Sequence, residues 1–245
     1  MFQTFFYEPI FNLVIFLYNT IPGHDLGVAI IALTIIIKLA LWSLSKQQIK
    51  AQKSLQDLQP KIEEIKSKHA NDKEAMSRAM LELYKEHKVN PLASCLPLLI
   101  QLPFLIAVFS VFRAGFTDET LKLVYSFIVR PETVNTLSFG FLELAKPNVA
   151  LAVLAGLAQF WQTKMMMTNR ATVKSKGARD EDMMAIMNKQ MMYMMPILTI
   201  FFGLTLPGGL SLYWFVSTLL TGAQQVFVFN KKQKDNKVIE GEVVE

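Results

Sequence analysis

The chain has 245 residues, of which 52% are hydrophobic and only 18% are charged. A soluble domain of this length would carry about a quarter charged residues, so the composition excludes an ordinary soluble globular domain and favours a chain that lies in a bilayer. The net charge is +5, and the single cysteine, Cys95, permits neither an internal disulfide nor a cysteine-based metal site.

The first 25 residues begin with an aromatic-rich stretch, Phe2 to Pro9, followed by an apolar run, Ile10 to Tyr18. This run is too short to cross about 30 Å of hydrocarbon, and Pro9 is expected to interrupt it. The segment has neither a basic beginning nor a small-residue cleavage site, which argues against a signal peptide. We expect residues 1–25 to form an interfacial helix on the outer side of the membrane, with a sixth span or a short signal anchor as the alternative.

Five later segments are long and apolar enough to cross a bilayer as helices. The fifth begins with a tight turn, Pro207-Gly208-Gly209, which predicts a hairpin with the segment before it. The sequence therefore predicts an all-α integral membrane protein with spans at residues 26–45, 91–113, 148–168, 190–206 and 207–229.

The basic residues orient these spans. Alternate connections hold ten, five and four Lys or Arg residues (46–90, 169–189 and 230–245), whereas the others hold none, three and none (1–25, 114–147 and 207–209). The positive-inside rule then places the N-terminus outside and the C-terminus in the cytoplasm.

Lys38 stands alone as an ionisable residue in the first apolar run. On a continuous helix it shares one face with Thr34, Trp42 and Ser45. A charge at mid-span costs several kcal/mol unless it meets water or a partner, and the five spans contain no Asp or Glu. We favour a wet cavity that opens toward the cytoplasm. Snorkelling to the cytoplasmic boundary, about 10 Å away along the helix, is the alternative.

Residues 46–90 are charged and helical in composition. Leu55, Leu58, Ile62 and Ile65 recur at helical spacing, as do Met76, Met80, Leu83 and His87 after a turn at residues 69–72. The two apolar stripes predict an antiparallel helical hairpin on the cytoplasmic side. Asp72 is the predicted N-cap of its second helix, and Pro60 is expected to bend the first. A solvated linker is the alternative.

Other polar residues can line the same cavity as Lys38. They are Gln101, Gln159, Gln162, Ser217, Thr218 and Thr221. Pro91, Pro97 and Pro103 free backbone carbonyls in the second span, which fits either an aqueous groove or a packing kink.

Ten of the 13 methionines lie at residues 165–167 and 183–195, around the cytoplasmic loop predicted at residues 169–189. They fit a surface for varied apolar guests or apolar filler that faces lipid.

Several motifs together resemble a known family. They are the lone cation of the first span, the charged hairpin, the run Asn90-Pro91-Leu92, the run Cys95 to Pro103, the run Phe160 to Met165, and the run Leu206 to Trp214. From Leu26 to Phe229 the chain resembles the YidC membrane-protein insertases of bacteria and their mitochondrial and chloroplast relatives.

The resemblance implies five spans around a hydrophilic groove that is open to the cytoplasm and lipid. It implies that Lys38 holds the position of the family's groove arginine, and that Phe160, Trp161, Tyr213 and Trp214 lie where a substrate helix slides between spans three and five. Lysine differs from arginine because it lacks the bidentate fork. The large outer domain of relatives from two-membrane bacteria is not seen, and the tail at residues 230–245 ends in Glu residues, so ribosome docking through a basic tail is not expected.

We therefore expect an insertase and chaperone of the bacterial inner membrane, without enzymatic activity, catalytic residue, cofactor or metal. Its expected partners are nascent membrane-protein substrates and lipid, with the Sec translocon and the ribosome as further candidates and no specific nucleic acid. A solute transporter or channel that uses Lys38 is the alternative, although the internal repeats typical of transporters are not seen. An intramembrane protease is disfavoured because His24, His69 and His87 lie outside the predicted spans.

Overall fold

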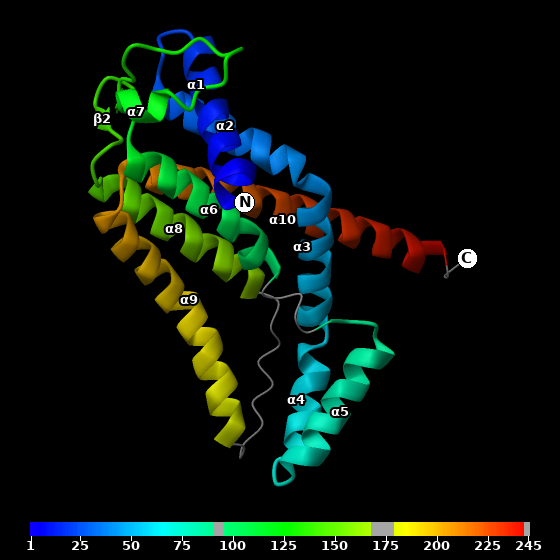
Figure 1. Cartoon of the computed structure of the whole chain (residues 1–245). Coiled ribbons are helices and arrows are strands. Elements are labelled where there is room, and N and C mark those ends of the chain that lie inside the picture. The colour runs from blue at the N-terminus through cyan, green and yellow to red at the C-terminus, as the bar shows by residue number, and fades with distance from the viewer. Residues whose placement is uncertain (91–95, 168–178, 243–245) are drawn as a thin grey trace. The chain divides into compact units, whose positions relative to one another are not determined.

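The computed structural model describes residues 1–90, 96–167 and 179–242, and nearly all of the regular structure in them is helical (Figure 1). The chain divides into two compact units. Unit 1 contains Met1–Leu41, Leu98–Gln162 and Met195–Thr221, and unit 2 contains Trp42–Pro97, Thr163–Met194 and Gly222–Glu245. Three sequence features lie outside the described residues, namely Pro91, Cys95 and residues 168–178 of the third span and cytoplasmic loop.

Unit 1 begins with a short π-helix, Gln3–Tyr7, which leads into α1, Glu8–Thr20. Pro9 lies in the first turn of α1, directly after the π-helix, and the backbone is helical on both sides of it. The expectation that Pro9 interrupts the helix is therefore wrong. α1 packs against α2, Leu26–Ala40, and its Phe11 and Ile15 are fully buried. A helix in this segment is confirmed, while its place in the membrane interface stays a prediction.

The connection after α6, Leu96–Ala114, contains a short helix and a hairpin that the sequence analysis did not predict. The helix is α7, Asp118–Leu121, and strands β1, Leu137–Ser138, and β2, Leu142–Glu143, pair antiparallel. Strands of two residues are too short for periodicity to reveal them.

Long-range hydrogen bonds join the N-terminal segment to this connection, and we call the side chains that form them the clamp. Asn12 donates to the Leu123 carbonyl and accepts from the Tyr125 N–H, at 3.1 and 2.7 Å. Asp25 accepts from the Phe139 N–H at 2.6 Å. The clamp consists of Asn12, Tyr18, Asn19, Asp25 and Ser138, and it fixes the N-terminal helices to the loop over them.

The last three helices are α8, Val149–Met167, α9, Arg179–Thr205, and α10, Gly208–Glu242. The predicted turn at Pro207 is confirmed between α9 and α10. There the Gly209 N–H donates to the Leu144 carbonyl at 2.9 Å, and a Cβ on Gly209 would lie 2.1 Å from the Phe112 ring, so only glycine fits. Both helices extend past the predicted bounds. Residues 179–189, expected in a loop, belong to α9, and α10 continues beyond residue 229.

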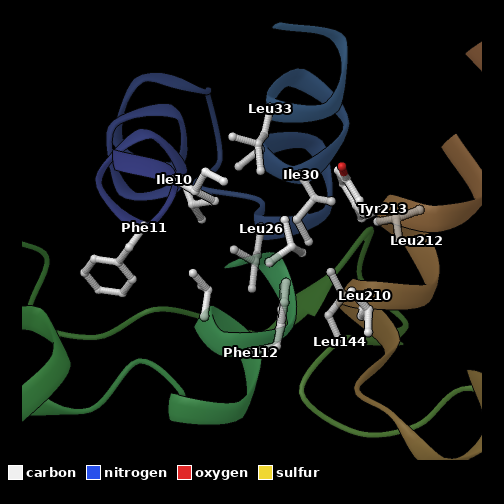
Figure 2. Packing of buried hydrophobic residues seen from close by; sticks show 14 of the residues in the cluster. Ile10, Phe11, Leu26, Ile30, Leu33, Phe112, Leu144, Leu210, Leu212 and Tyr213 are labelled. Carbon is white, nitrogen blue, oxygen red and sulfur yellow. The ribbon is translucent and has the colours of Figure 1, made fainter. Parts of the chain in front are cut away.

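The core of unit 1 combines the two N-terminal helices with α6, α10 and the 114–147 connection. Figure 2 shows residues of this cluster, with Tyr213 at its margin and the hydroxyl oxygen at the tip of the side chain. Leu26, Ile30 and Leu33 of α2 are fully buried there.

Unit 2 begins where the first predicted span breaks. α2 ends at Ala40 and α3, Trp42–Asp57, begins two residues later, so the prediction of one helix over residues 26–45 is wrong. The run contains neither proline nor glycine at the break. Within unit 2 the Gln224 amide donates to the Trp42 carbonyl at 3.2 Å, and Trp42 lies beside Phe227 with ring centroids 6.5 Å apart. These long-range contacts at the start of α3 are invisible in local sequence.

The predicted helical hairpin is present in unit 2 as α4, Gln59–Lys68, and α5, Lys73–Glu86. Leu58, Ile62 and Leu83 form its buried core. The Asp72 carboxylate accepts from the N–H groups of Glu74 and Ala75, which confirms it as N-cap. The helical run from Trp42 to Lys68 is interrupted at Leu58, two residues before Pro60, which lies in the first turn of α4. The bend predicted at Pro60 takes the form of this interruption.

Among the described residues, Gly208–Phe229 is the one unbroken helix whose length and composition suit a membrane crossing. α2 and the helix after it have the length and composition of a membrane crossing only when they are taken together as one broken span. Leu99–Ala114 and Met192–Thr205 are shorter apolar helices. Unit 1 nevertheless exposes many large apolar side chains while it buries polar ones. Exposed examples are Leu99, Ile106, Leu157, Ile197 and Phe201, and buried ones are Thr34, Thr199, Ser211, Ser217 and Thr218.

Candidate functional site: a polar cluster around Lys38

Lys38 lies in the last turn of α2, just before the break at Leu41. The carbonyl groups at a helix C-terminus carry partial negative charge, so this position favours a cation. Lys38 is half-buried, and its ammonium donates to the Thr221 hydroxyl at 2.9 Å and to the Gln101 amide oxygen at 3.3 Å. Three helices that are distant in sequence thus meet at one cation.

Gln101 connects this cation to a buried tyrosine. The Gln101 Nε2 donates to the Tyr213 hydroxyl at 2.5 Å while its Oε1 accepts from Lys38. Tyr213 is only 1% exposed, and its ring belongs to the apolar core. The amide therefore has opposite ends fixed by two different partners.

Thr221 completes the chain of contacts. Its hydroxyl accepts from Lys38 and donates to the Ser217 carbonyl one turn earlier, at 2.8 Å. Ser217 and Thr218 are themselves buried. We call Lys38, Gln101, Tyr213, Ser217 and Thr221 the Lys38 cluster.

The remaining predicted groove residues take different places. Thr34 is fully buried, but its hydroxyl donates to the Ile30 carbonyl of its own helix at 2.7 Å. Gln159 and Gln162 lie half-buried on α8 in the same unit. The break at Leu41 places Trp42 and Ser45 in unit 2, so the single helical face expected for Thr34, Lys38, Trp42 and Ser45 does not exist.

The four residues expected along the path of the substrate helix differ in burial and surroundings. Trp161 of α8 is 44% exposed, and Phe160 beside it is half-buried. Trp214 lines a small pocket together with Thr199 and Ser211. Tyr213 instead belongs to the Lys38 cluster.

The charge of Lys38 is balanced by dipoles. Its partners are one amide and one hydroxyl, and no carboxylate forms an ion pair with it among the described residues. A lysine ammonium has three N–H donors, of which two have these partners. The site can therefore hold one further acceptor, and a carboxylate or carbonyl oxygen suits it best.

Tyr213 is the cluster member that sequence reasoning assigned to another role. Its spacing contained a signal, because Tyr213, Ser217 and Thr221 follow one another at intervals of four on a single helix. Gln224 and Gln225, both buried, continue this polar face of α10 and were also missed. The family resemblance assigned Tyr213 to the path of the substrate helix, and Gln224 and Gln225 were assigned no role.

Metal chemistry finds no support in the described part of the chain, which holds no group of three or more His, Cys, Asp or Glu residues placed to bind an ion.

Comparisons with known proteins match almost the whole chain. The family described as 60Kd inner membrane protein matches residues 16–236. A protein of Fusobacterium nucleatum named membrane protein insertase YidC is 37% identical over 233 residues, which cover 94% of this chain and 99% of that protein.

Two further relatives carry the same name. The one from Citrifermentans bemidjiense is 37% identical over 93% of this chain, and the one from Haemophilus influenzae is 33% identical over 94%. The chain spans 37% and 38% of the length of these two proteins, respectively.

Proposed function

The chain belongs to the 60Kd inner membrane protein family, and from this premise we propose that it is a membrane protein insertase that works through the Lys38 cluster. The family and the relatives place it in the inner membrane. The observation that carries the proposal is a half-buried cation held by an amide and a hydroxyl from two other helices, in a unit whose exposed surface is rich in apolar side chains.

The membrane arrangement follows from the charge pattern. Five spans, with the N-terminus outside and the C-terminus in the cytoplasm, put every basic-rich connection on the cytoplasmic side. The hairpin of α4 and α5 then lies in the cytoplasm, where it receives substrates. The long apolar helix Gly208–Phe229 supports the fifth span.

The cluster lowers the barrier for a polar segment that must cross. Hydrocarbon excludes polar and charged groups at a cost of several kcal/mol. A substrate tail that enters from the cytoplasm exchanges water for the Lys38 ammonium, the Gln101 amide and the Thr221 hydroxyl. The unused ammonium donor holds an acidic or carbonyl group for a short time, which divides one high barrier into two lower ones.

The apolar helix of the substrate leaves along a different surface. Trp161 is exposed on α8 and Trp214 lines a cavity bordered by α8, α9 and α10. Burial of about 20 apolar residues in lipid supplies the driving force, so no nucleotide is needed at this step.

Partners follow from this function. The substrates are nascent membrane proteins, and the Sec translocon and the ribosome are candidates that deliver them. The relatives are insertases by name, which gives no support to a transporter.

A depletion experiment tests the proposal. A bacterial strain depleted of its own insertase is supplied with this chain, with Lys38→Ala or with Lys38→Arg, and insertion of a small phage-coat-type protein is followed by protease accessibility of its tail. We expect the wild type and Lys38→Arg to restore insertion. Lys38→Ala should insert a substrate with a charged tail at least tenfold less efficiently than the wild type does.

The matched control is Lys122→Ala, which removes an exposed lysine from the 114–147 connection and should insert as the wild type does. A wild-type chain that is stable in the membrane but inserts no substrate would refute the insertase function. If Lys38→Ala inserts charged tails as well as the wild type does, Lys38 has no part in the insertase function.

A further inference from the structure

We propose that Tyr213 and Gln101 are positioning residues that aim the Lys38 ammonium, so that Tyr213 sets the preference of the chain for acidic over neutral substrate tails. This inference rests on the proposed insertase function and assigns Tyr213 a role apart from any contact with the sliding helix. The supporting contacts all lie within unit 1.

The two ends of the Gln101 amide differ in what they offer to Lys38. Its oxygen can accept from Lys38, whereas its NH2 group, turned toward the ammonium, would place donor against donor. Rotation about the last side-chain bond of glutamine is broad and nearly two-fold, so the amide alone does not choose between these orientations. The ammonium itself favours the orientation that presents the oxygen, and a second partner is needed to hold the amide in that place.

The Tyr213 hydroxyl is that second partner. Gln101 Nε2 donates to it at 2.5 Å, and this contact holds the amide where Oε1 accepts from Lys38. Tyr213 cannot follow the amide if it moves, because its ring is 1% exposed and packed into the apolar core. The rigid packing of Tyr213 therefore fixes the position of the Gln101 amide.

The consequence reaches the third ammonium donor. With Gln101 and Thr221 fixed, two N–H bonds of Lys38 have defined directions, and the tetrahedral ammonium directs the third one to a defined place. If Gln101 leaves this position, the ammonium keeps only Thr221 as an acceptor. It can then rotate about that hydrogen bond, and the direction of the third N–H is no longer fixed. A carboxylate on the substrate tail then meets a cation whose N–H does not point toward it, so its binding weakens. The binding of a neutral tail weakens much less.

The test uses Tyr213→Phe, which keeps the buried ring and removes only the acceptor. Two single-span substrates differ only by Asp or Asn in the translocated tail, and insertion of each into the depleted strain is followed by protease accessibility. For the wild type we expect the Asp tail to be favoured. Tyr213→Phe should reduce the ratio of Asp-tail to Asn-tail insertion by about threefold to tenfold, the range for one hydrogen bond, with the Asn tail nearly unchanged.

Tyr18→Phe is the matched control, because Tyr18 is also a buried tyrosine of unit 1 whose hydroxyl accepts one hydrogen bond, from the Asn135 N–H at 2.9 Å. It should leave the ratio unchanged. A Tyr213→Phe variant with the wild-type ratio, or with equal losses for both tails, would overturn the positioning role while insertion itself stands. A wild type without preference for the Asp tail would overturn it as well. A stable wild-type chain that inserts neither substrate would refute the proposed function itself.

Discussion

Unit 1 buries polar side chains in two places, the clamp and the Lys38 cluster, and the two differ in which groups satisfy the hydrogen bonds of those side chains. In the clamp, Asn12 is 2% exposed and binds three backbone groups, the carbonyls of Glu8 and Leu123 and the N–H of Tyr125. In the Lys38 cluster, the ammonium binds two side chains and keeps one donor without a described partner.

The difference separates structural from functional burial. Backbone groups of a folded connection are fixed, so a side chain that satisfies them stabilises one conformation. A desolvated cation that has no carboxylate partner among the described residues is an energetic cost that folding alone does not require. We infer that the clamp holds the fold and that the Lys38 cluster serves the substrate.

Removal of Asn12 should have the largest effect on stability. Asn12→Ala removes the hydrogen bonds to the Leu123 carbonyl and the Tyr125 N–H, which belong to half-buried residues, and should lower the free energy of unfolding by about 2–4 kcal/mol. Thermal unfolding of the detergent-solubilised chain measures this. Asn19→Ala, which removes one exposed hydrogen bond to the Val129 carbonyl, should cost less than about 1 kcal/mol. Equal melting of Asn12→Ala and wild type would show that the clamp does not hold the fold.

Replacement of Lys38 should act in the opposite direction. Lys38→Met removes a desolvated cation that has no described carboxylate partner and fills similar volume, so the chain should be as stable as wild type or more stable by about 1 kcal/mol. The same variant should lose insertion of acidic-tailed substrates. If Lys38→Met destabilises the chain as much as Asn12→Ala does, the proposed division between the two sites is wrong.

Asp25 should give the smallest effect, and one that depends on pH. Partial burial raises the pKa of its carboxyl, but hydrogen bonds from the N–H groups of Phe139 and Val28 outweigh this and hold the pKa below its ordinary value of 3.8. A carboxyl with a lowered folded-state pKa contributes stability above that ordinary value, and loses it as the pH falls through the lowered one.

Unfolding at pH 7 and at pH 3 should therefore differ less for Asp25→Asn than for wild type, by about a few tenths of a kcal/mol because solvent screens the carboxylate. The exposed control Glu119→Gln should keep the wild-type difference. If the free energy of unfolding of Asp25→Asn depends on pH as that of the wild type does, Asp25 does not contribute to the loss of stability in acid.

Local sequence predicted the features that local physics determines. The N-cap Asp72, the apolar stripes of α4 and α5, and the turn at Pro207 were all predicted correctly because each depends on residues within a few positions. The importance of Lys38 was also visible, since a lone cation in an apolar run is unusual in any fold.

Features determined by distant residues could not be predicted in this way. The break at Leu41 has no proline or glycine at it, and the contacts of Trp42 at the start of α3 come from α10. The Lys38 cluster joins residues up to 183 positions apart. The sequence also could not show that the hydroxyl of Tyr213 meets Gln101, because an aromatic pair on an apolar helix reads equally well as lipid-facing surface.

Disulfide cross-linking tests most directly whether a substrate tail passes the Lys38 cluster. In a Cys95→Ser background, Thr221→Cys reports on the cluster and Trp161→Cys on the exposed surface of α8, while a substrate with one cysteine in its tail or in its apolar helix is held at mid-insertion. We expect the tail cysteine to form a disulfide at position 221 and the helix cysteine to form one at position 161. A tail that cross-links at position 161 and never at position 221, while insertion continues, would contradict the account.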